Sequence, residues 1–256
     1  SDTVLRALAA SPASVVSIDV KTPRLDDRET VRDALIDVIR ASRGRSQPLE
    51  SITVSSEGLV PFVRFAQALD GLHGLQRLIL RGTYMHEDSL QALIVSLGSL
   101  SQLVALDLGG SQIPDDLVGQ VAGALVRFTR LRKLGLSCVG MDEQMLATFS
   151  YTITRAQASS LTSLDISQNY GHLLECGETL ARIARNCTNL TQLNLSCCGL
   201  TENEVEPLFR ELQNSTALTD LDLSLNSIDF NGLHSFRQMV EAVSYTHLTL
   251  PTKRIV

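Results

Sequence analysis

The sequence contains no tryptophan, and aromatic residues make up only 4% of its 256 residues. A hydrophobic core of this composition has to be built mainly from leucine, isoleucine, valine and alanine. No apolar run approaches the ~20 residues that a membrane-spanning helix needs, so we expect no membrane segment. The first residues, which include Asp2, do not form a signal peptide as they stand. Because the chain starts at Ser1, the sequence leaves open whether a signal or an anchor preceded it.

The sequence also lacks the motifs of common enzymes and metal sites. It has no phosphate-binding G-x-x-x-x-G-K-[ST], no dinucleotide-binding G-x-G-x-x-G after a strand, no H-E-x-x-H and no G-x-S-x-G. Its cysteines form no C-x-x-C pair and have no nearby histidines, so we expect no zinc site. We therefore predict a protein without a cofactor and without enzymatic activity.

The five cysteines are expected to be small, reduced side chains, most of them buried. They are Cys138, Cys176, Cys187, Cys197 and Cys198. The adjacent pair Cys197 and Cys198 has no accompanying base or electropositive pocket in the sequence, which argues against a catalytic cysteine. Cys198 is expected to be buried, and Cys197 to lie at the exit of a strand.

The formal net charge is −6, which argues against nucleic acid as a partner because phosphate binding favours a basic face. One short basic stretch, RFTRLRK at residues 127–133, falls where a helix-to-strand loop is expected. A solvated loop is the favoured interpretation of this stretch.

The most informative feature of the sequence is a repeat with leucine-rich spacing. If the first apolar residue is position one, further apolar residues fall at positions four, six and eleven, as in LTQLNLSCCGL. The eight repeats start at Val15, Leu49, Leu75, Leu103, Leu131, Leu161, Leu190 and Leu218. From the second repeat onward the starts are 26 to 30 residues apart. Regular spacing of this kind indicates a solenoid, in which each repeat buries its apolar residues against its neighbours.

Each repeat is predicted to contain a short strand followed by a helix. The L-x-L core alternates between inward and outward residues, as a strand does. The later part of each repeat places apolar residues three and four apart, as in Val205, Leu208 and Leu212. Thr201 and Glu204 form the T-x-x-E pattern of a helix capping box. The expected helices are residues 28–41, 59–70, 87–98, 115–127, 142–156, 202–214 and 231–243.

The repeat resembles the leucine-rich repeat, in the long-unit subtype of ribonuclease inhibitor. The resemblance covers residues 15–243 and implies an α/β leucine-rich-repeat solenoid, a horseshoe segment with a parallel concave sheet and convex helices. Position nine is usually asparagine in this family, and its side chain bonds the backbone at the turn. Only Asn169 and Asn226 match, and Cys198 takes this place in the seventh repeat. We therefore expect a weak asparagine ladder.

The domain limits follow from the extent of the repeat. Residues 1–243 are predicted to be one leucine-rich-repeat domain of about eight repeats, a fragment of a longer array. Residues 2–10 fit either the end of an earlier helix or an N-terminal cap. Residues 244–256 fit either a partial ninth repeat or a non-native tail, since SYTHLTLPTKRIV resembles a translated adapter sequence.

The candidate binding residues lie at positions three, five and seven, which face out of the core into the expected concavity. These candidates are Arg77, Ile79, Arg81, Asp107, Lys133, Asp165, Asn194, Asp220 and Asp222. A basic group on the middle repeats and an acidic row on the late repeats would steer a charged partner and set its register. The aspartates also fit a simpler interpretation, because L-D-L-S is a common wording of this repeat. Large aromatic anchors are missing from this face.

The resemblance implies protein recognition, as in ribonuclease inhibitor and the sensor regions of NOD-like receptors. It therefore favours a non-catalytic cytoplasmic scaffold or sensor that binds a protein partner on its concave face. The alternative is a GTPase-activating regulator acting through edge loops, as in Ran GTPase-activating protein. A purely structural spacer is a third possibility. The fold alone does not choose among these functions.

Overall fold

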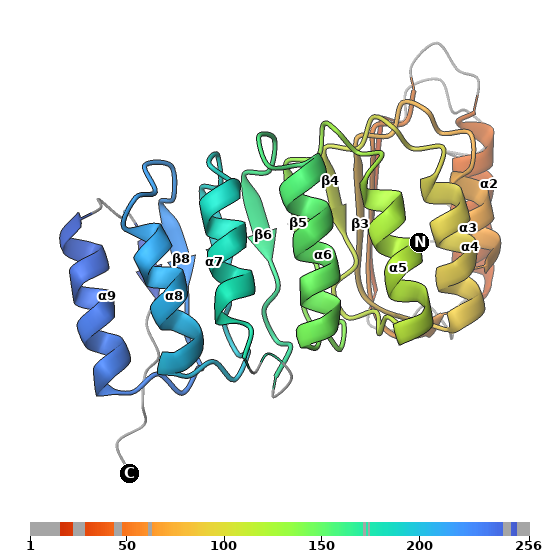
Figure 1. The fold of residues 1–256 in the computed structure, drawn as a ribbon. Helices are drawn as coiled ribbons and strands as arrows, with labels where there is room; N and C mark the ends of the chain where they lie inside the picture. Colours follow the sequence, from red (N-terminus) through yellow and green to blue (C-terminus); the bar gives the residue numbers. More distant parts are fainter. Residues whose placement is uncertain are drawn as a thin grey trace. The chain divides into compact units, whose positions relative to one another are not determined.

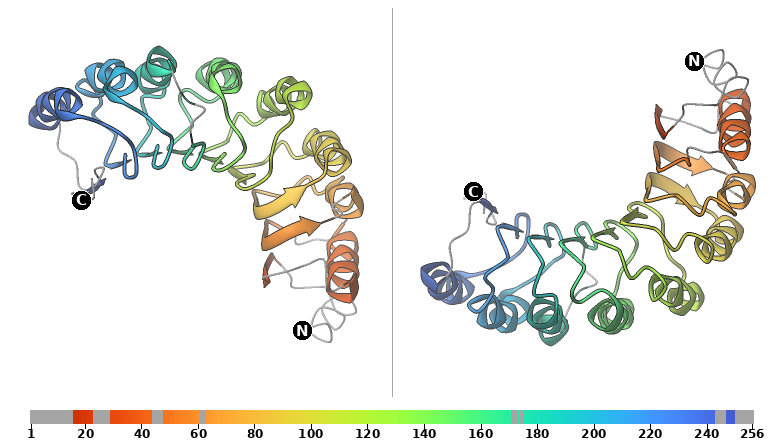
Figure 2. Two further views of the ribbon diagram at one scale, coloured as in Figure 1. Left: turned by 90° about the horizontal axis from the view of Figure 1, so that it is seen from below. Right: turned by 90° about the horizontal axis from the view of Figure 1, so that it is seen from above.

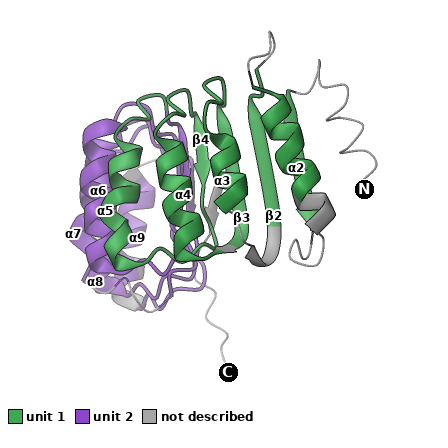
Figure 3. Ribbon diagram, turned by 90° about the vertical axis from the view of Figure 1, so that its right-hand side faces the viewer, with its two compact units in different colours: residues 1–130 green, residues 131–256 purple. Residues whose placement is uncertain are grey.

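The structure is a computed structural model, and it describes residues 16–22, 29–43, 48–60, 63–170, 173, 175–242 and 247–249. Residues 2–10, expected to be the end of an earlier helix or an N-terminal cap, and most of residues 244–256 lie outside the described residues. The chain forms two compact units, residues 1–130 and 131–256, which we call the N-terminal and the C-terminal unit (Figure 3). Each unit is described by itself.

In the N-terminal unit, parallel strands alternate with helices along the chain (Figure 1). The strands, in the order β1-β2-β3-β4, are Ser17–Thr22, Ser51–Val60, Arg77–Met85 and Ala105–Asp107. The helices α2 to α5 are Glu29–Ala41, Val63–Leu69, Glu87–Leu97 and Asp115–Leu125. All position-three residues are in register, because Ser51 pairs with Ser17 and with Arg77, and Arg77 pairs with Ala105. The helices cover one face of this sheet (Figure 2).

The C-terminal unit repeats the pattern with shorter strands. Strands β5 to β9 are Lys133–Gly135, Ser163–Asp165, Gln192–Asn194, Asp220–Asp222 and His247–Thr249. Helices α6 to α9 are Glu143–Ala156, Gly177–Asn186, Glu202–Leu212 and Phe230–Ala242. Neighbouring strands are parallel and in register, and β9 continues the pairing, with Leu248 opposite Leu221. The solenoid of alternating strands and helices predicted from the repeat is therefore confirmed in both units.

The second repeat differs from the prediction at the boundary between strand and helix. Residues 59 and 60, expected in a helix, belong to β2, and α3 begins only at Val63. After an irregularity between Ser55 and Gly58, residues 58–60 pair with residues 83–85 of β3. This long-range pairing satisfies backbone groups of residues 58–60, so it outweighs the local helical pattern.

The core lies between each sheet and its helices. Leucines at positions one, four and six are buried, as at Leu75, Leu78 and Leu80, which have no exposed surface. Burying one leucine side chain contributes about 1.5–3 kcal/mol. The core is not purely aliphatic, however, because four phenylalanines fill it as well: Phe65, Phe128, Phe149 and Phe209.

Helix α8 shows how local sequence and packing agree. The predicted apolar residues Val205, Leu208 and Leu212 are buried, and Phe209 of the same helix is buried with them. The predicted capping box is present, with Thr201 at the N-cap and Glu204 bonded back to the Thr201 backbone. The Phe209 ring packs edge-on against Phe236 of α9, with ring centroids 5.7 Å apart. A ring pair of this geometry adds about 0.5–1.5 kcal/mol beyond area burial.

Candidate protein-binding sheet faces

From the third to the eighth repeat, the residue at position eight has a left-handed backbone conformation, within β3 in the third repeat and in the turn after the strand in the others. In the N-terminal unit this residue is Gly82 or Gly110, with φ of 68° and 84°. In the C-terminal unit it is a residue with a side chain, at φ of 52° to 60°: Cys138, Gln168, Cys197 and Leu225. A side chain in this conformation costs roughly 1–2 kcal/mol, so neighbouring interactions have to hold these turns in place.

Asparagines at position nine supply such interactions in the C-terminal unit. The Asn226 Oδ1 atom accepts hydrogen bonds from the amides of Cys198 at 3.0 Å and Leu200 at 3.1 Å, one repeat earlier. Its Nδ2 atom donates to the carbonyls of Leu195 and Leu223. The expected bonding of the turn by this asparagine is therefore present, and it reaches into the preceding repeat.

Asn169 makes the same set of bonds for the fifth repeat. Its Oδ1 atom accepts from the amides of Val139 and Met141, both at 3.0 Å, and its Nδ2 atom donates to Leu136 and Ile166. Asn169 is buried. Each of these two asparagines thus serves buried backbone groups that would otherwise be costly.

Cys198 partly replaces the asparagine in the seventh repeat. Its Sγ atom donates to the carbonyl of Ile166 at 3.2 Å, in the preceding repeat. Burial raises the pKa of the Cys198 thiol to about 12, so it stays protonated at neutral pH and acts as a donor. The prediction that Cys198 is buried is confirmed, and Cys197 lies at the exit of β7, where it is partly exposed.

The acidic row at position five has a structural role that sequence analysis underestimated. The Oδ1 atoms of Asp165 and Asp222 accept hydrogen bonds from the amides two residues later, at 3.1 and 2.9 Å. Asn194 does the same for Ser196. A short polar side chain commonly fixes a turn in this way. The D-x-S spacing was a usable signal for these turns.

Asp107 corrects the expectation of an exposed contact residue. It is only 6% exposed, and its Oδ1 atom accepts from the amide of Gly109 at 2.9 Å. Its Oδ2 atom lies 2.5 Å from Nε of Arg81, whose side chain is 54% exposed. The Asp107 carboxylate is therefore used to fix the turn and to hold Arg81, rather than facing outward.

A threonine ladder at position two was missed by sequence analysis. The hydroxyls of Thr162, Thr191 and Thr219 donate to the position-two carbonyl of the preceding repeat, at 3.1, 2.9 and 3.1 Å. Each carbonyl also accepts backbone amides of the next strand. Threonine at the same position in three consecutive repeats was the sequence signal for this ladder.

The candidate residues therefore form two groups, one in each unit. In the N-terminal unit, Arg77, Ile79 and Arg81 share one side of β3, and Ile79 pairs with Asp107 of β4. In the C-terminal unit, Asp165, Asn194 and Asp222 are aligned across β6, β7 and β8. Exposed Lys133 begins β5, and half-buried Asp220 begins β8, where Gln192 contacts it at 3.4 Å.

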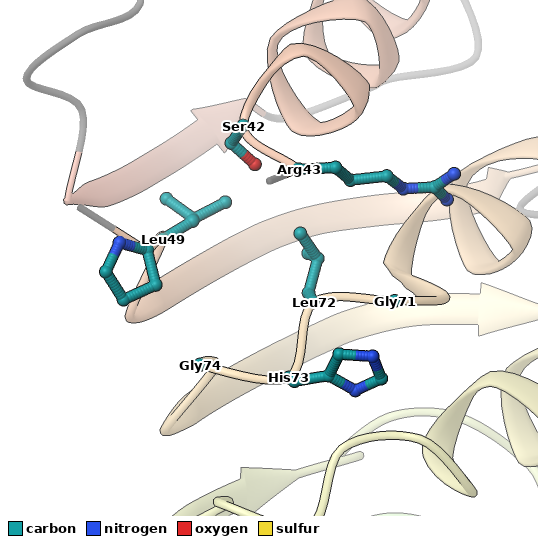
Figure 4. Close-up of a pocket in the computed structure, with 8 residues that line it drawn as sticks. Ser42, Arg43, Leu49, Gly71, Leu72, His73 and Gly74 are labelled. Atoms are coloured by element: carbon teal, nitrogen blue, oxygen red, sulfur yellow. The ribbon is translucent and has the colours of Figure 1, made fainter. Parts of the chain in front are cut away.

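A small pocket of about 160 Å³ lies at the helix-to-strand loops of the N-terminal unit (Figure 4). Leu49 and Leu72 line it, and the Arg43 side chain extends toward the end of α3. The Arg43 guanidinium donates to the carbonyls of Gln67 and Ala68, and Nδ1 of His73 is 3.3 Å from the carbonyl of Ser99. Both polar side chains thus tie loops together, and the pocket presents no paired acid and base.

In the part of the chain that the structure describes, no group of three or more metal-ligating side chains occurs. None of the described helices has both the length and the apolar character to cross a bilayer.

Comparisons with known proteins support the repeat assignment. No family model matches the chain. Over 180 residues, or 69% of the chain, it is 32% identical to NACHT, LRR and PYD domains-containing protein 14 of Homo sapiens. Over 152 residues, or 58% of the chain, it is 26% identical to NLR family CARD domain-containing protein 4 of Bos taurus. These matches span 16% and 14% of the length of the two relatives.

Among solved structures, an internalin from Listeria monocytogenes aligns with 97% of the chain and 74% of its own chain. That alignment has 16% identity and a TM-score of 0.49. The tropomodulin C-terminal domain of Caenorhabditis elegans covers 60% of the chain and 90% of its own, at 16% identity and a TM-score of 0.48. The leucine spacing, the parallel strands with their helices, and the NLR-type relatives together make this chain a member of the leucine-rich-repeat proteins.

Proposed function

We propose that this segment is a non-catalytic scaffold or sensor that binds a protein partner on the sheet face opposite the helices. The observation that carries the proposal is on β3, where exposed Arg77 stands beside half-buried Ile79 on that face. The described helices cover the other face of this parallel sheet, so an isoleucine between two arginines on the uncovered face is a candidate contact residue. A cytoplasmic location belongs to the same proposal and rests on the repeat resemblance alone.

The C-terminal face supports partner binding less directly. Asp165 and Asp222 each use one carboxylate oxygen to fix a turn. The carboxylates keep their negative charge, which contributes to the electrostatic field around the face. Such a field raises association rates more than it adds contact energy. We therefore place the principal contact on the N-terminal unit, with the acidic row as a steering surface.

Affinity capture from matched cell lysate, with identification of bound proteins by mass spectrometry, tests this function. The full chain is compared with Arg77→Glu and with Asp222→Lys, and circular dichroism checks that each variant folds. Arg127→Glu, a charge reversal at an exposed residue just after α5, serves as the matched control. We expect a partner that is lost with Arg77→Glu and retained by Arg127→Glu. If all variants capture the same proteins, the sheet face is not the site.

The alternative of a GTPase activator acting through edge loops makes a different prediction. Single-turnover GTP hydrolysis by a small GTPase would be accelerated by the chain, and Arg77→Glu would leave that acceleration unchanged. Acceleration of this kind would replace the scaffold proposal.

A further inference from the structure

The charges on the N-terminal sheet face are unequally compensated. On β1, Lys21 lies 3.6 Å from Asp19. On β3, Arg81 is held by buried Asp107. Within the stretches that the structure describes, the guanidinium of Arg77 has no ion-pair or hydrogen-bond partner. Arg77 therefore carries the unmatched positive charge of this face.

The surroundings of Arg77 leave room for a partner. Its neighbours across the sheet are Ser51 and Ala105, both with short side chains. Ile79 lies two residues further along the same face, between Thr53 of β2 and buried Asp107 of β4, whose carboxylate holds Arg81. Residues two apart on a strand are separated by about 6.6 Å. The face thus presents one unmatched guanidinium and one apolar side chain at the repeat distance of an extended chain.

We infer that this face binds an extended acidic segment of a protein partner, with a carboxylate side chain on Arg77 and an apolar side chain two residues away on Ile79. The inference rests on the proposed function and adds the chemical class of the partner. An arginine can bind a carboxylate through two parallel hydrogen bonds. An extended peptide projects alternate side chains to one side with the same period as β3. The recognised pattern is therefore Glu or Asp, any residue, then Leu, Ile, Val or Met.

The acidic sheet face of the C-terminal unit does not support a second site for a basic segment of a partner. Its aspartates accept hydrogen bonds from their own turns, and these bonds account for the acidic row without any ligand. The pocket at the helix-to-strand loops is not such a site either, because carbonyls of α3 already hold its Arg43.

Methyl nuclear magnetic resonance of the isoleucine-labelled 256-residue chain tests the inference with a reporter inside the site. The probe is a seven-residue Gly/Ser peptide that carries Glu-Ser-Leu at its centre, titrated to 5 mM because one short contact is weak. Ile79 reports the site, and buried Ile153 of α6 is the control resonance. We expect a saturable shift of the Ile79 methyl signal and no shift at Ile153.

Matched peptides and protein variants test whether binding depends on the acidic side chain, on the spacing and on Arg77. Lys-Ser-Leu should produce no shift, and Glu-Leu-Ser, with the wrong spacing, should bind more weakly than Glu-Ser-Leu. Arg77→Gln and Arg77→Glu should lower the affinity about tenfold or more, while Arg127→Glu should leave it unchanged. Inorganic phosphate is titrated to the same concentration of negative charge as the peptide. A shift of the Ile79 methyl signal with phosphate would mean that the face responds to any anion and does not recognise the peptide.

Several outcomes would overturn the inference. These are an unchanged Ile79 signal at 5 mM peptide, equal binding by Arg77→Glu, equal binding of the lysine peptide, and an equal response to phosphate. If lysate capture still depends on Arg77 in any of these cases, the proposed function stands and only the acidic class of partner is wrong. If capture is also insensitive to Arg77, both proposals fail.

Discussion

The two units stabilise the turns at the ends of their strands in different ways. In the N-terminal unit, Gly82 and Gly110 are the left-handed residues at position eight, and β2 and β3 are 10 and 9 residues long. In the C-terminal unit, side chains occupy that position, and the described strands are three residues long. There asparagine, aspartate and threonine side chains bond the backbone of the turns, and the N-terminal unit has fewer described bonds of this kind, from Asp107 and Ser111. The same repeat can therefore be stabilised by backbone freedom and longer pairing, or by buried side-chain hydrogen bonds.

The starts of α6 and α8 show the same contrast, although α7 begins after Cys176 without a side-chain capping bond. In the N-terminal unit, α4 and α5 begin after His86 and Pro114, which make no side-chain capping bond. In the C-terminal unit, Asp142 accepts from the amide of Met145 at 2.7 Å, and Thr201 and Glu204 form a complete capping box. The C-terminal unit thus depends on particular polar side chains, so single substitutions there should cost more stability.

The largest difference should come from the position-nine side chains. Asn226→Ala removes an acceptor for two amides and a donor to two carbonyls, so we expect a loss of about 3 kcal/mol or more in the free energy of unfolding. Ser111→Ala in the N-terminal unit removes one bond, from Oγ to the carbonyl of Thr83, and should cost about 1 kcal/mol. Urea denaturation of both variants measures this difference, with exposed Asn214→Ala as the control. Equal losses at Asn226 and Ser111 would contradict the contrast between the units.

Substitution at position eight should have opposite signs in the two units. An added Cβ at Gly110 would lie 2.8 Å from Cα of Gly82, and φ there is 84°, so Gly110→Ala should cost about 2–3 kcal/mol. Gln168→Gly relieves a left-handed side-chain conformation and should change stability by less than about 1 kcal/mol, in the stabilising direction. Thermal unfolding of the two variants compares them. A marked loss for Gln168→Gly would show that its side chain, rather than the backbone, holds the turn.

A smaller effect, with a defined pH dependence, is expected at Glu204. Burial raises the pKa of this carboxyl, but hydrogen bonds from the Thr201 hydroxyl and from the amides of Thr201 and Glu175 outweigh burial and lower the pKa below its ordinary value. The stabilisation is therefore present above the unfolded pKa and is lost as the pH falls through the folded pKa. Glu204→Gln should cost about 1–2 kcal/mol at pH 7, and its difference from wild type should shrink below pH 4.5.

Denaturation curves of Glu204→Gln at pH 7 and at pH 3.5 measure this change. Glu87→Gln, at the exposed start of α4 in the N-terminal unit, is the control and should change stability by a few tenths of a kcal/mol at most. If the loss of unfolding free energy in Glu204→Gln is the same at both pH values, the negative charge of Glu204 does not contribute to stability.

The smallest perturbation is thiol labelling, which needs no substitution. All five cysteines lie in the C-terminal unit. Burial raises the pKa values of Cys176, Cys187 and Cys198 to about 12, 11 and 12, so these thiols should not react at pH 8. Cys138 and Cys197 are partly exposed. Intact-mass measurement after alkylation should show two rapid adducts, and three more only in denaturant; five rapid adducts would mean that this unit opens readily.

Sequence analysis predicted the repeat, the register and the core, because leucine spacing is local and recurs through the chain. It could not predict the length of β2, since the strand conformation of residues 58–60 depends on pairing with residues 83–85. The partners of Asn226 were equally inaccessible, because they lie one repeat away in three dimensions. The candidate site was predicted less well than the fold. Asp107 was expected to be exposed and is buried under Arg81, a result of packing across two strands.

The side-chain ladders all run in one direction along the chain. Asn226, Cys198, Thr219 and Ser111 each bond to the repeat that precedes their own. The turn of each such repeat therefore depends on side chains from the next repeat in the chain. Deleting one repeat should disturb the turn of the repeat before it more than the turn of the repeat after it. For protein engineering, modules should not be exchanged from one leucine-rich strand to the next. An exchangeable block has to include the position-nine side chain of the repeat that follows it, and a shortened array needs a capping segment that supplies those hydrogen bonds.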